Sequence, residues 1–563
     1  MYYRISLFAA ACCCMLLTTT SCEDYLKEEL VSNVSAATYY PTRAGFEDAV
    51  KATYSFTKPF YGVERGFTLT VFGTDTYTNG SDGGFKGINT YDGRLSPTDN
   101  IISDTWRDLY RGVNQANAVI NRSATLEGIT DEEKTVRLAE VRFLRALYYF
   151  DLVRIFGDVH LTLEETEGVE IEANRTAASE IYLQAIIPDL EFAIANLPVE
   201  QGDYGRATKP AAEFLLGKVL LRRSYTNYAG DGDAARAEEL FTTVIEDYNF
   251  QLLDNYADLW DIDNERNSEV VWAIQNAKSQ VDEGLDDNGN RGHLYFLMEY
   301  DNQPGMTRDI ENGRPWKRFR PTPFTLQLWD RSVDTRYDGS FKSVWYANNP
   351  GTIPKYTAEE AAAGYGKEGE PKFEAGDTAI YIPGPQLEDA WPQSRQAATR
   401  YQVITSDEYT ERLYPTLSKW LDPTRPNRQH MQGQRDVPLM RLGDAYLLRA
   451  EARLRQNDTE GAAADINVIR ERAAVEGQEA AIMITPDRVN LDFLLDERAR
   501  ELVGEGHRWF DLTRTMTLVD RVKKYNEQAA PNIKDYHVVR PIPQNQIDRT
   551  LGGYPQNTGY LGG

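Results

Sequence analysis

Two glutamates, Glu497 and Glu501, are the residues of this chain that come nearest to an acid–base pair. A pair of carboxylates can divide the roles of acid and base or nucleophile when a glycosidic bond is hydrolysed. One helical turn apart, they would share the polar face of a helix whose apolar side includes Leu494 and Leu495. Arg500 would lie within reach for an ion pair. We therefore interpret both glutamates as structural and predict no reaction from them.

The other motifs that carry chemistry are missing or incomplete. The five histidines are scattered without an HExxH pair, and neither a GxSxG elbow nor a P-loop is present. Gly364, Gly366 and Gly369 match GxGxxG, but no strand precedes them and no helix follows, so we reject a dinucleotide site. A calcium loop starting at Asp286 fails because Arg291 stands where such a loop needs glycine. We predict no catalytic residue, no metal site and no cofactor, and thus a protein that is not an enzyme.

All four cysteines lie at the N-terminus, and Cys22 is the last of them. Arg4 precedes an apolar run too short to span a bilayer, and small or hydroxylated residues follow at Thr18–Ser21, as in a signal peptide. Cleavage after residue 21 would leave Cys22 as the first residue, which resembles a bacterial lipoprotein acylated at its N-terminal cysteine. Several acyl chains anchor a protein far more firmly than one. We predict lipidation at Cys22, with the acyl chains as membrane anchor.

Charge and composition limit the ligands of the 563-residue chain. Its net charge of −25 repels phosphate backbones, which argues against nucleic acid as a partner, and it disfavours strongly sulfated or uronic-acid polymers. Hydrophobic residues make up 41%, enough for a sizeable core, and no later apolar run reaches membrane length. Glu23 and Asp24 resemble the surface-export signals of some Gram-negative lipoproteins. We expect a body outside the bilayer, tethered by lipid and exposed at the cell surface.

The elements that would position any site are mostly helices. Asp131–Phe156 carries two apolar rows at helical spacing, and a second helix starts near Thr208, followed after a polar break by a third that completes an antiparallel hairpin. Near the C-terminus, Ala452 and Ala464 of another hairpin have the spacing of the small residues in a tetratricopeptide repeat, where they let paired helices approach closely. The pattern predicts a mainly all-α fold with degenerate tetratricopeptide-like repeats.

Between the helical regions the sequence becomes rich in Gly, Pro, Asn, Asp and aromatic residues. Residues 61–105 and 280–435 have few periodic stretches, and we interpret both as long ordered loops, where binding residues tend to lie. The predicted organisation is a signal peptide at 1–21, a lipidated tether at 22–40, an N-terminal helical part with tetratricopeptide-like hairpins at 41–279, a loop-rich part at 280–435 and a C-terminal helical part at 436–563.

Several segments together resemble the SusD/RagB-like family of outer-membrane lipoproteins that bind nutrients. They are residues 142–159, 206–221, 437–455 and 494–514, with the closing "PIPQNQID" and "YPQNTGY". They occur in the family's order and, with Cys22, span nearly the whole mature chain. The chain departs from the family pattern at His160, where proline is usual, and at Thr19, where the lipoprotein signal prefers leucine.

The resemblance implies a lipid-anchored protein of the outer membrane that binds its ligand without turning it over. It also implies a partner, a SusC-like TonB-dependent outer-membrane transporter, on which the lipoprotein sits as a lid and to which it delivers captured oligosaccharide. Some members of the family take peptides, so peptides or glycopeptides stay open as alternative ligands. A surface glycan hydrolase is the third alternative, and the missing catalytic residues disfavour it.

Because the family motifs belong to the scaffold, we predict the ligand contacts from the chemistry of sugars. A protein holds a sugar by laying an exposed aromatic ring against its C–H face and placing polar side chains at its hydroxyl rim. For each aromatic residue, packing beneath a loop is the alternative. The candidates, taken from the two loop-rich regions, are Tyr77, Asn79, Tyr91, Asp92, Arg314, Trp316, Trp345 and Tyr346.

Overall fold

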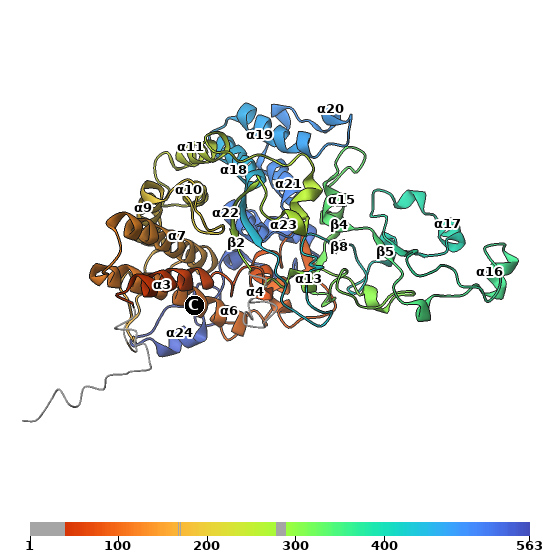
Figure 1. Ribbon diagram of the computed structural model, residues 1–563, viewed down its shortest axis with the longest axis horizontal. Coiled ribbons are helices and arrows are strands. Elements are labelled where there is room, and N and C mark those ends of the chain that lie inside the picture. The colour runs from red at the N-terminus through yellow and green to blue at the C-terminus, as the bar shows by residue number, and fades with distance from the viewer. Residues whose placement is uncertain (1–39, 167, 169, 277–288) are drawn as a thin grey trace, which may run out of the picture.

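The computed structural model describes residues 40–166, 168, 170–276 and 289–563. The predicted signal peptide, Cys22 and Asp286 lie outside these residues. Helices predominate in the described part and the strands are short, so the predicted mainly α-helical fold is confirmed (Figure 1). No helix of these residues is both long and apolar enough to cross a membrane.

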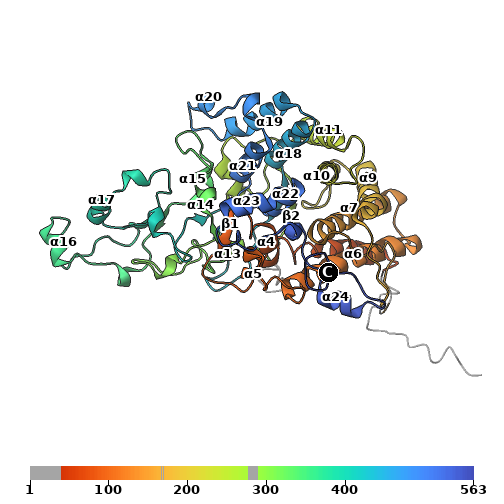
Figure 2. The same cartoon turned by 180° about the vertical axis from the view of Figure 1, so that it is seen from behind.

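Helices pack one upon the next to form the body of the protein. The series runs α6 (Asn100–Arg122), α7 (Asp131–Phe156), α9 (Ile187–Asn196), α10 (Lys209–Arg223), α11 (Asp233–Glu246), α18 (Leu442–Arg455) and α19 (Thr459–Arg472). α3 (Arg43–Ser55) covers α6 and α7. Because α11 packs directly against α18, helices from the two ends of the chain form one array, which both views show (Figures 1 and 2).

Helix α7 has the bounds that its periodicity predicted. Its first turn is capped by Thr130, whose side chain accepts a hydrogen bond from the amide of Glu133 at 3.1 Å. Gly157 follows the last residue with a φ of 79°, a conformation that favours glycine and ends the helix. Every residue from Ala139 to Phe156 except Arg142 is buried, as expected for a helix with two apolar rows.

Two helix details predicted from the sequence differ in the structure. Thr208 is the N-cap residue of α10, but its side chain makes no capping bond, and its buried hydroxyl has no partner among the described residues. Ala452 of α18 is buried as predicted, whereas Ala464 of α19 is exposed. Ala462 and Ala463 are the buried alanines of α19 instead, so the repeat spacing identified the hairpin but not the small residues at its interface.

Short strands organise the loop-rich regions. β1 (Tyr77–Asn79) pairs with β3 (Phe319–Pro321), β2 (Val270–Ile274) with β9 (Val437–Arg441), β4 (Phe341–Lys342) with β8 (Thr416–Leu417), and β5 (Val344–Tyr346) with β6 (Thr378–Tyr381), which also pairs with β7 (Gln402–Val403). Residues 61–105 are not loop throughout, because α4 (Glu64–Thr70) and α5 (Lys86–Thr90) lie within them.

Part of the loop-rich region extends away from the helices as an arm. The arm carries β5, α16 (Ala358–Ala362) and α17 (Gln393–Ala398), and it projects from the body in both views (Figures 1 and 2). A small hydrophobic core of its own, which includes Trp345 and Ile380, holds its sheet. The arm therefore has internal packing in addition to its attachment to the body.

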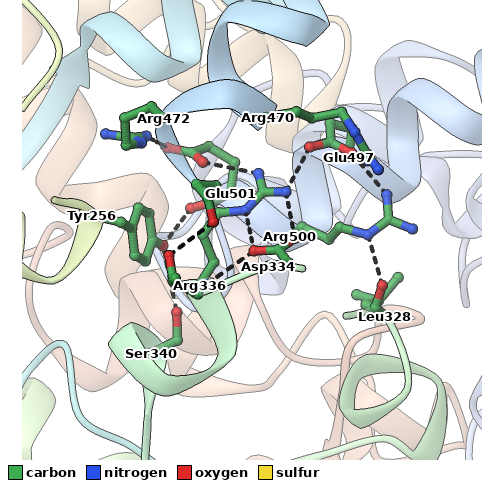
Figure 3. Close-up of polar contacts among 12 residues, drawn as sticks. Tyr256, Leu328, Asp334, Arg336, Ser340, Arg470, Arg472, Glu497, Arg500 and Glu501 are labelled. Atoms are coloured by element: carbon green, nitrogen blue, oxygen red, sulfur yellow. Dashed lines mark hydrogen bonds and ion pairs between the residues drawn. The ribbon is translucent and has the colours of Figure 1, made fainter. Parts of the chain in front are cut away.

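Buried ion pairs join α21 (Leu491–Glu501) to the loop-rich region (Figure 3). The polar helix face that Glu497 and Glu501 were predicted to share is not exposed to solvent, because both side chains are fully buried. The Arg336 guanidinium donates to both, at 2.8 Å to Glu497 and 3.1 Å to Glu501. Burial alone would raise the pKa of Glu497, but Arg336, Arg500 and Arg470 outweigh it and lower that pKa to about 2. Both carboxylates are ionised partners of arginine, which agrees with their structural interpretation.

Candidate functional site

The β1–β3 pair brings together two segments that are far apart in the sequence. Asn79 at the end of β1 lies opposite Phe319 at the start of β3. Beyond this point the amide of Gly80 donates to the carbonyl of Arg318 at 2.9 Å, and the amide of Asp82 donates to that of Lys317 at 3.3 Å. The Gly-rich loop near residue 80 thus lies beside the segment that carries Trp316.

Trp316 is a half-buried ring at this junction. It packs edge-to-face on Tyr295 with ring centroids 5.9 Å apart. The guanidinium of Arg318 lies 4.9 Å from the Trp316 ring centroid and that of Arg314 lies 5.7 Å from it, within the range of cation–π attraction. The indole N–H has no hydrogen-bond acceptor in the described chain, although the backbone amide of Trp316 is fixed to Leu294. The ring is held in place and keeps an unused donor.

Acidic residues hold Arg318 beside the ring. Its Nε lies 2.8 Å from Glu64 and its Nη1 lies 3.0 Å from Asp82. Burial raises the pKa of Glu64 above its ordinary value even though Arg318 opposes the shift. Gly83 has a φ of 108°, and a Cβ at this position would lie 2.8 Å from the Arg318 Cδ, so glycine is required here. We call Trp316, Arg314, Arg318 and Asp82 the Trp316 surface.

The Trp316 surface has the chemistry of a sugar-binding platform. An indole ring offers an apolar face to the C–H groups of a sugar ring. Guanidinium groups donate hydrogen bonds and the Asp82 carboxylate accepts them, so hydroxyl groups around the ring would find both kinds of partner. Arg314 also donates to the backbone carbonyl of Gln429 at 3.2 Å, which restrains its side chain.

Three of the predicted aromatic contacts are enclosed by protein. Tyr77 is fully buried, and its hydroxyl has no partner among the described residues. Tyr91 is buried and donates its hydroxyl hydrogen to the carbonyl of Gly73 at 2.7 Å. Trp345 is buried in the core of the arm. In this conformation none of these rings has a face open to a ligand, so all three pack inside the protein, the alternative considered for each aromatic residue.

The remaining candidates differ in their surroundings. Asn79 is buried at the end of β1, and its backbone N–H donates to the side-chain oxygen of Gln528 at 3.2 Å. Asp92 forms an ion pair with Arg94 at 2.6 Å, and the hydrogen bonds from Arg94 hold its pKa below the ordinary value. Tyr346 is 58% exposed, but it belongs to the arm and not to the Trp316 surface. The structure thus brings Arg314 and Trp316 together and leaves the others apart.

The arm also carries an aromatic cluster that was not predicted from the sequence. The Trp391 ring lies 5.2 Å from that of Tyr381 and 6.3 Å from that of Tyr401, and the Arg395 guanidinium lies 4.0 Å from its centroid. All three rings are partly exposed, and their polar tips have no hydrogen-bond partner within the described residues. The parallel pairing of β6 and β7 assembles this cluster, and the only trace of it in the sequence is a tryptophan in a polar segment.

The fold is an array of helical repeats that carries aromatic and hydrogen-bonding groups on its loops, an arrangement suited to binding a ligand. No group of three or more His, Cys, Asp or Glu in the described ranges is arranged to hold a metal ion.

Comparison with known proteins places the chain in one family. The model of the SusD family matches residues 246–560, and a second model, described as starch-binding associating with outer membrane, matches residues 33–221. The chain belongs to the SusD family. The resemblance predicted from its sequence motifs is thereby confirmed.

Relatives and solved structures agree with this assignment. A SusD-like protein of Formosa agariphila is 27% identical over 95% of this chain and 97% of its own length. The starch-binding protein SusD of Bacteroides thetaiotaomicron is 26% identical over 77% of this chain and 74% of its own. A crystal structure of a SusD homologue from the same species has a TM-score of 0.70 at 20% identity and covers 93% of this chain and 98% of its own. A laminarin binding SusD-like protein has a TM-score of 0.66 at 23% identity and covers 92% of this chain and 100% of its own.

Proposed function

We propose that this protein is a lipid-anchored receptor of the outer membrane that binds oligosaccharide at the Trp316 surface and delivers it to a SusC-like TonB-dependent transporter. The observation that carries the proposal is the half-buried indole of Trp316, with the guanidinium groups of Arg314 and Arg318 near its ring and its N–H unused. The starch-binding name of one relative and the starch-binding, outer-membrane description of one matching family model support glycan over peptide as the ligand.

The protein acts by binding and does not cleave its ligand. The two glutamates that came nearest to a catalytic pair are buried and occupied by arginines, and the Trp316 surface offers hydrogen-bonding groups around an aromatic ring. Such a surface recognises a sugar by its shape and hydroxyl pattern without activating a nucleophile.

A binding screen separates the glycan from the peptide ligand. The full-length acylated protein, purified in detergent, is applied to an array of neutral and acidic glycans and to a pool of peptides of similar length. We expect binding to one group of glycans, with no shortened product when the bound glycan is recovered and analysed by mass spectrometry. Binding restricted to peptides would contradict the ligand assignment, and release of shorter saccharides would contradict the proposal that the protein does not act as an enzyme.

Purification from the native membrane tests the transporter partner. A tag on the C-terminus, analysed after mild solubilisation, should recover a TonB-dependent transporter in a fixed ratio to the lipoprotein. Recovery of the lipoprotein alone at the same detergent concentration, while other outer-membrane complexes stay intact, would count against the partner.

A further inference from the structure

A groove lies along the same β1–β3 pair that carries the Trp316 surface. It has a volume of about 430 Å³ and is lined by residues from β1, β3, the segment after β6 and the end of α23 (Leu518–Tyr525). None of the eight ligand-contact candidates from the sequence lines it. The lining residues that matter below are Arg320, Glu388, Tyr409, Tyr525 and Glu527.

Arg320 lines this groove without a protein partner. Its guanidinium makes neither an ion pair nor a hydrogen bond with any described residue, and its Nε is buried. The neighbouring Arg318, by contrast, is paired with two carboxylates. A desolvated donor without an acceptor costs free energy, so an arginine in this state is prepared for an acceptor that arrives with a ligand. Its planar fork suits two adjacent oxygen atoms.

Tyr409 supplies a second unpaired group in the same groove. Its hydroxyl is buried and has no hydrogen-bond partner among the described residues. Burial raises the pKa of this phenol, so the group stays neutral and can both donate and accept. Arg320 and Tyr409 come from segments far apart in the chain, and the groove is the feature that unites them.

The remaining walls provide an apolar face and acceptors. The half-buried Tyr525 ring stacks on Phe324 with centroids 4.0 Å apart, so it forms a rigid wall. Glu527 is exposed and has no ion-pair partner in the described chain, whereas Glu388 accepts two hydrogen bonds from Ser406. The groove therefore combines donors, acceptors and an aromatic surface.

This combination favours hydroxyl groups over anions. A sugar hydroxyl both donates and accepts, so it can use Arg320 and the glutamates together. A carboxylate or sulfate only accepts, and it would meet two carboxylates for one guanidinium in a chain whose net charge is −25. We propose that the groove is a second carbohydrate subsite, in which two neighbouring hydroxyls of an uncharged sugar accept from Arg320 and a third binds Tyr409. This inference rests on the proposed glycan-binding function.

Calorimetry with defined probes tests the subsite. The probes are laminarihexaose, maltohexaose and a hexamer of galacturonic acid, together with any neutral oligosaccharide that the array of the preceding section identifies. The variants are Arg320→Gln, Tyr409→Phe and, as a matched control, Arg400→Gln, an exposed arginine of the arm outside the groove. Thermal unfolding of Arg320→Gln should stay close to that of the wild type, because this substitution breaks no hydrogen bond or ion pair with the described residues.

For a neutral oligosaccharide that the wild type binds, Arg320→Gln should weaken affinity about tenfold or more, because a bidentate charged donor is lost. Tyr409→Phe should weaken it several-fold, whereas Arg400→Gln should leave it unchanged. Wild-type affinity in Arg320→Gln, together with a loss in Trp316→Ala, would overturn the subsite and leave the proposed function standing. Tighter binding of the galacturonate hexamer would overturn the choice of an uncharged sugar. Failure of the wild type to bind any glycan would overturn both.

Discussion

Arg336 and Glu501 lie 3.1 Å apart in the interior of the protein, although 165 residues separate them in the chain (Figure 3). Arg336 belongs to the loop-rich region and Glu501 ends α21, so their ion pair fastens the part that carries ligand groups to the helical body. Arg441 and Arg472 bind the same carboxylate from β9 and α19. Three elements therefore depend on one buried charge.

Replacement of the Glu501 carboxylate should destabilise the protein. Glu501→Gln removes one counter-charge that three buried arginines share, and we expect a loss of about 3–5 kcal/mol in the free energy of unfolding, as for other broken buried ion pairs. Urea unfolding monitored by circular dichroism measures it. The exposed Glu368→Gln should change stability by no more than about 0.5 kcal/mol. Equal stability of the two variants would contradict the role of the network.

The same carboxylates predict a loss of stability in acid. The pKa of Glu497 is lowered from 4.5 to about 2 in the folded protein. A depressed folded-state pKa contributes stability that is complete above the unfolded value and is lost as the pH falls. The unfolding free energy should therefore decline from about pH 5 and fall most steeply between pH 4.5 and 2. Unfolding midpoints measured across this range test it, and a flat profile between pH 5 and 3 would contradict it.

Trp316→Ala should weaken binding of the recognised glycan by about 1.5–3 kcal/mol, or roughly ten- to a hundredfold, as for a central aromatic anchor. Because the ring also packs on Tyr295, a stability loss of about 1 kcal/mol is expected with it. Trp345→Ala is the opposite control. It leaves a cavity at a buried site and should lower the free energy of unfolding by about 3–5 kcal/mol, whereas the protein that remains folded should keep its affinity for the glycan. Calorimetry and thermal unfolding on both variants distinguish a platform from a packed ring.

Tyr77→Phe should be neutral or stabilising. The hydroxyl of Tyr77 is buried without a partner among the described residues, so its removal relieves a desolvated polar group at a gain of up to about 1 kcal/mol. Binding should not change, because the ring has no open face. A large loss of affinity in a stable Tyr77→Phe protein would show that this ring moves to contact the ligand.

Cys22→Ala should abolish acylation. Labelled palmitate should enter the wild-type protein and not the variant, and the variant should leave the membrane fraction, since Cys22 is the residue predicted to carry the anchor. The folded body should keep its unfolding midpoint with or without reductant, because no cysteine follows Cys22. Label retained in Cys22→Ala would rule out this anchoring site.

The helical body could be predicted from the sequence because its signals are local. The apolar rows of α7, its cap and the terminal Gly157 all lie within one segment, so the whole helix could be predicted from local sequence. The sequence motifs identified the SusD family for the same reason, since each motif is a short contiguous segment of the scaffold. It was harder to predict which face of α19 is buried, because the rotation of the helix against α18 decides whether Ala463 or Ala464 is exposed.

The candidate site depended on contacts between distant segments. Composition could place aromatic rings in loops, but it could not distinguish Trp316, which is only half-buried, from Tyr77, Tyr91 and Trp345, which other segments cover. In a helix, buried side chains recur with each turn, so their positions can be predicted from the spacing of apolar residues. In a loop, the burial of a side chain depends on which distant segments of the chain pack on it. The sequence by itself therefore determined the family, the helical repeats and the predicted anchor. Only the tertiary structure decided which rings face solvent, that Glu497 and Glu501 are enclosed by arginines, and that Arg320 lines a groove without a partner.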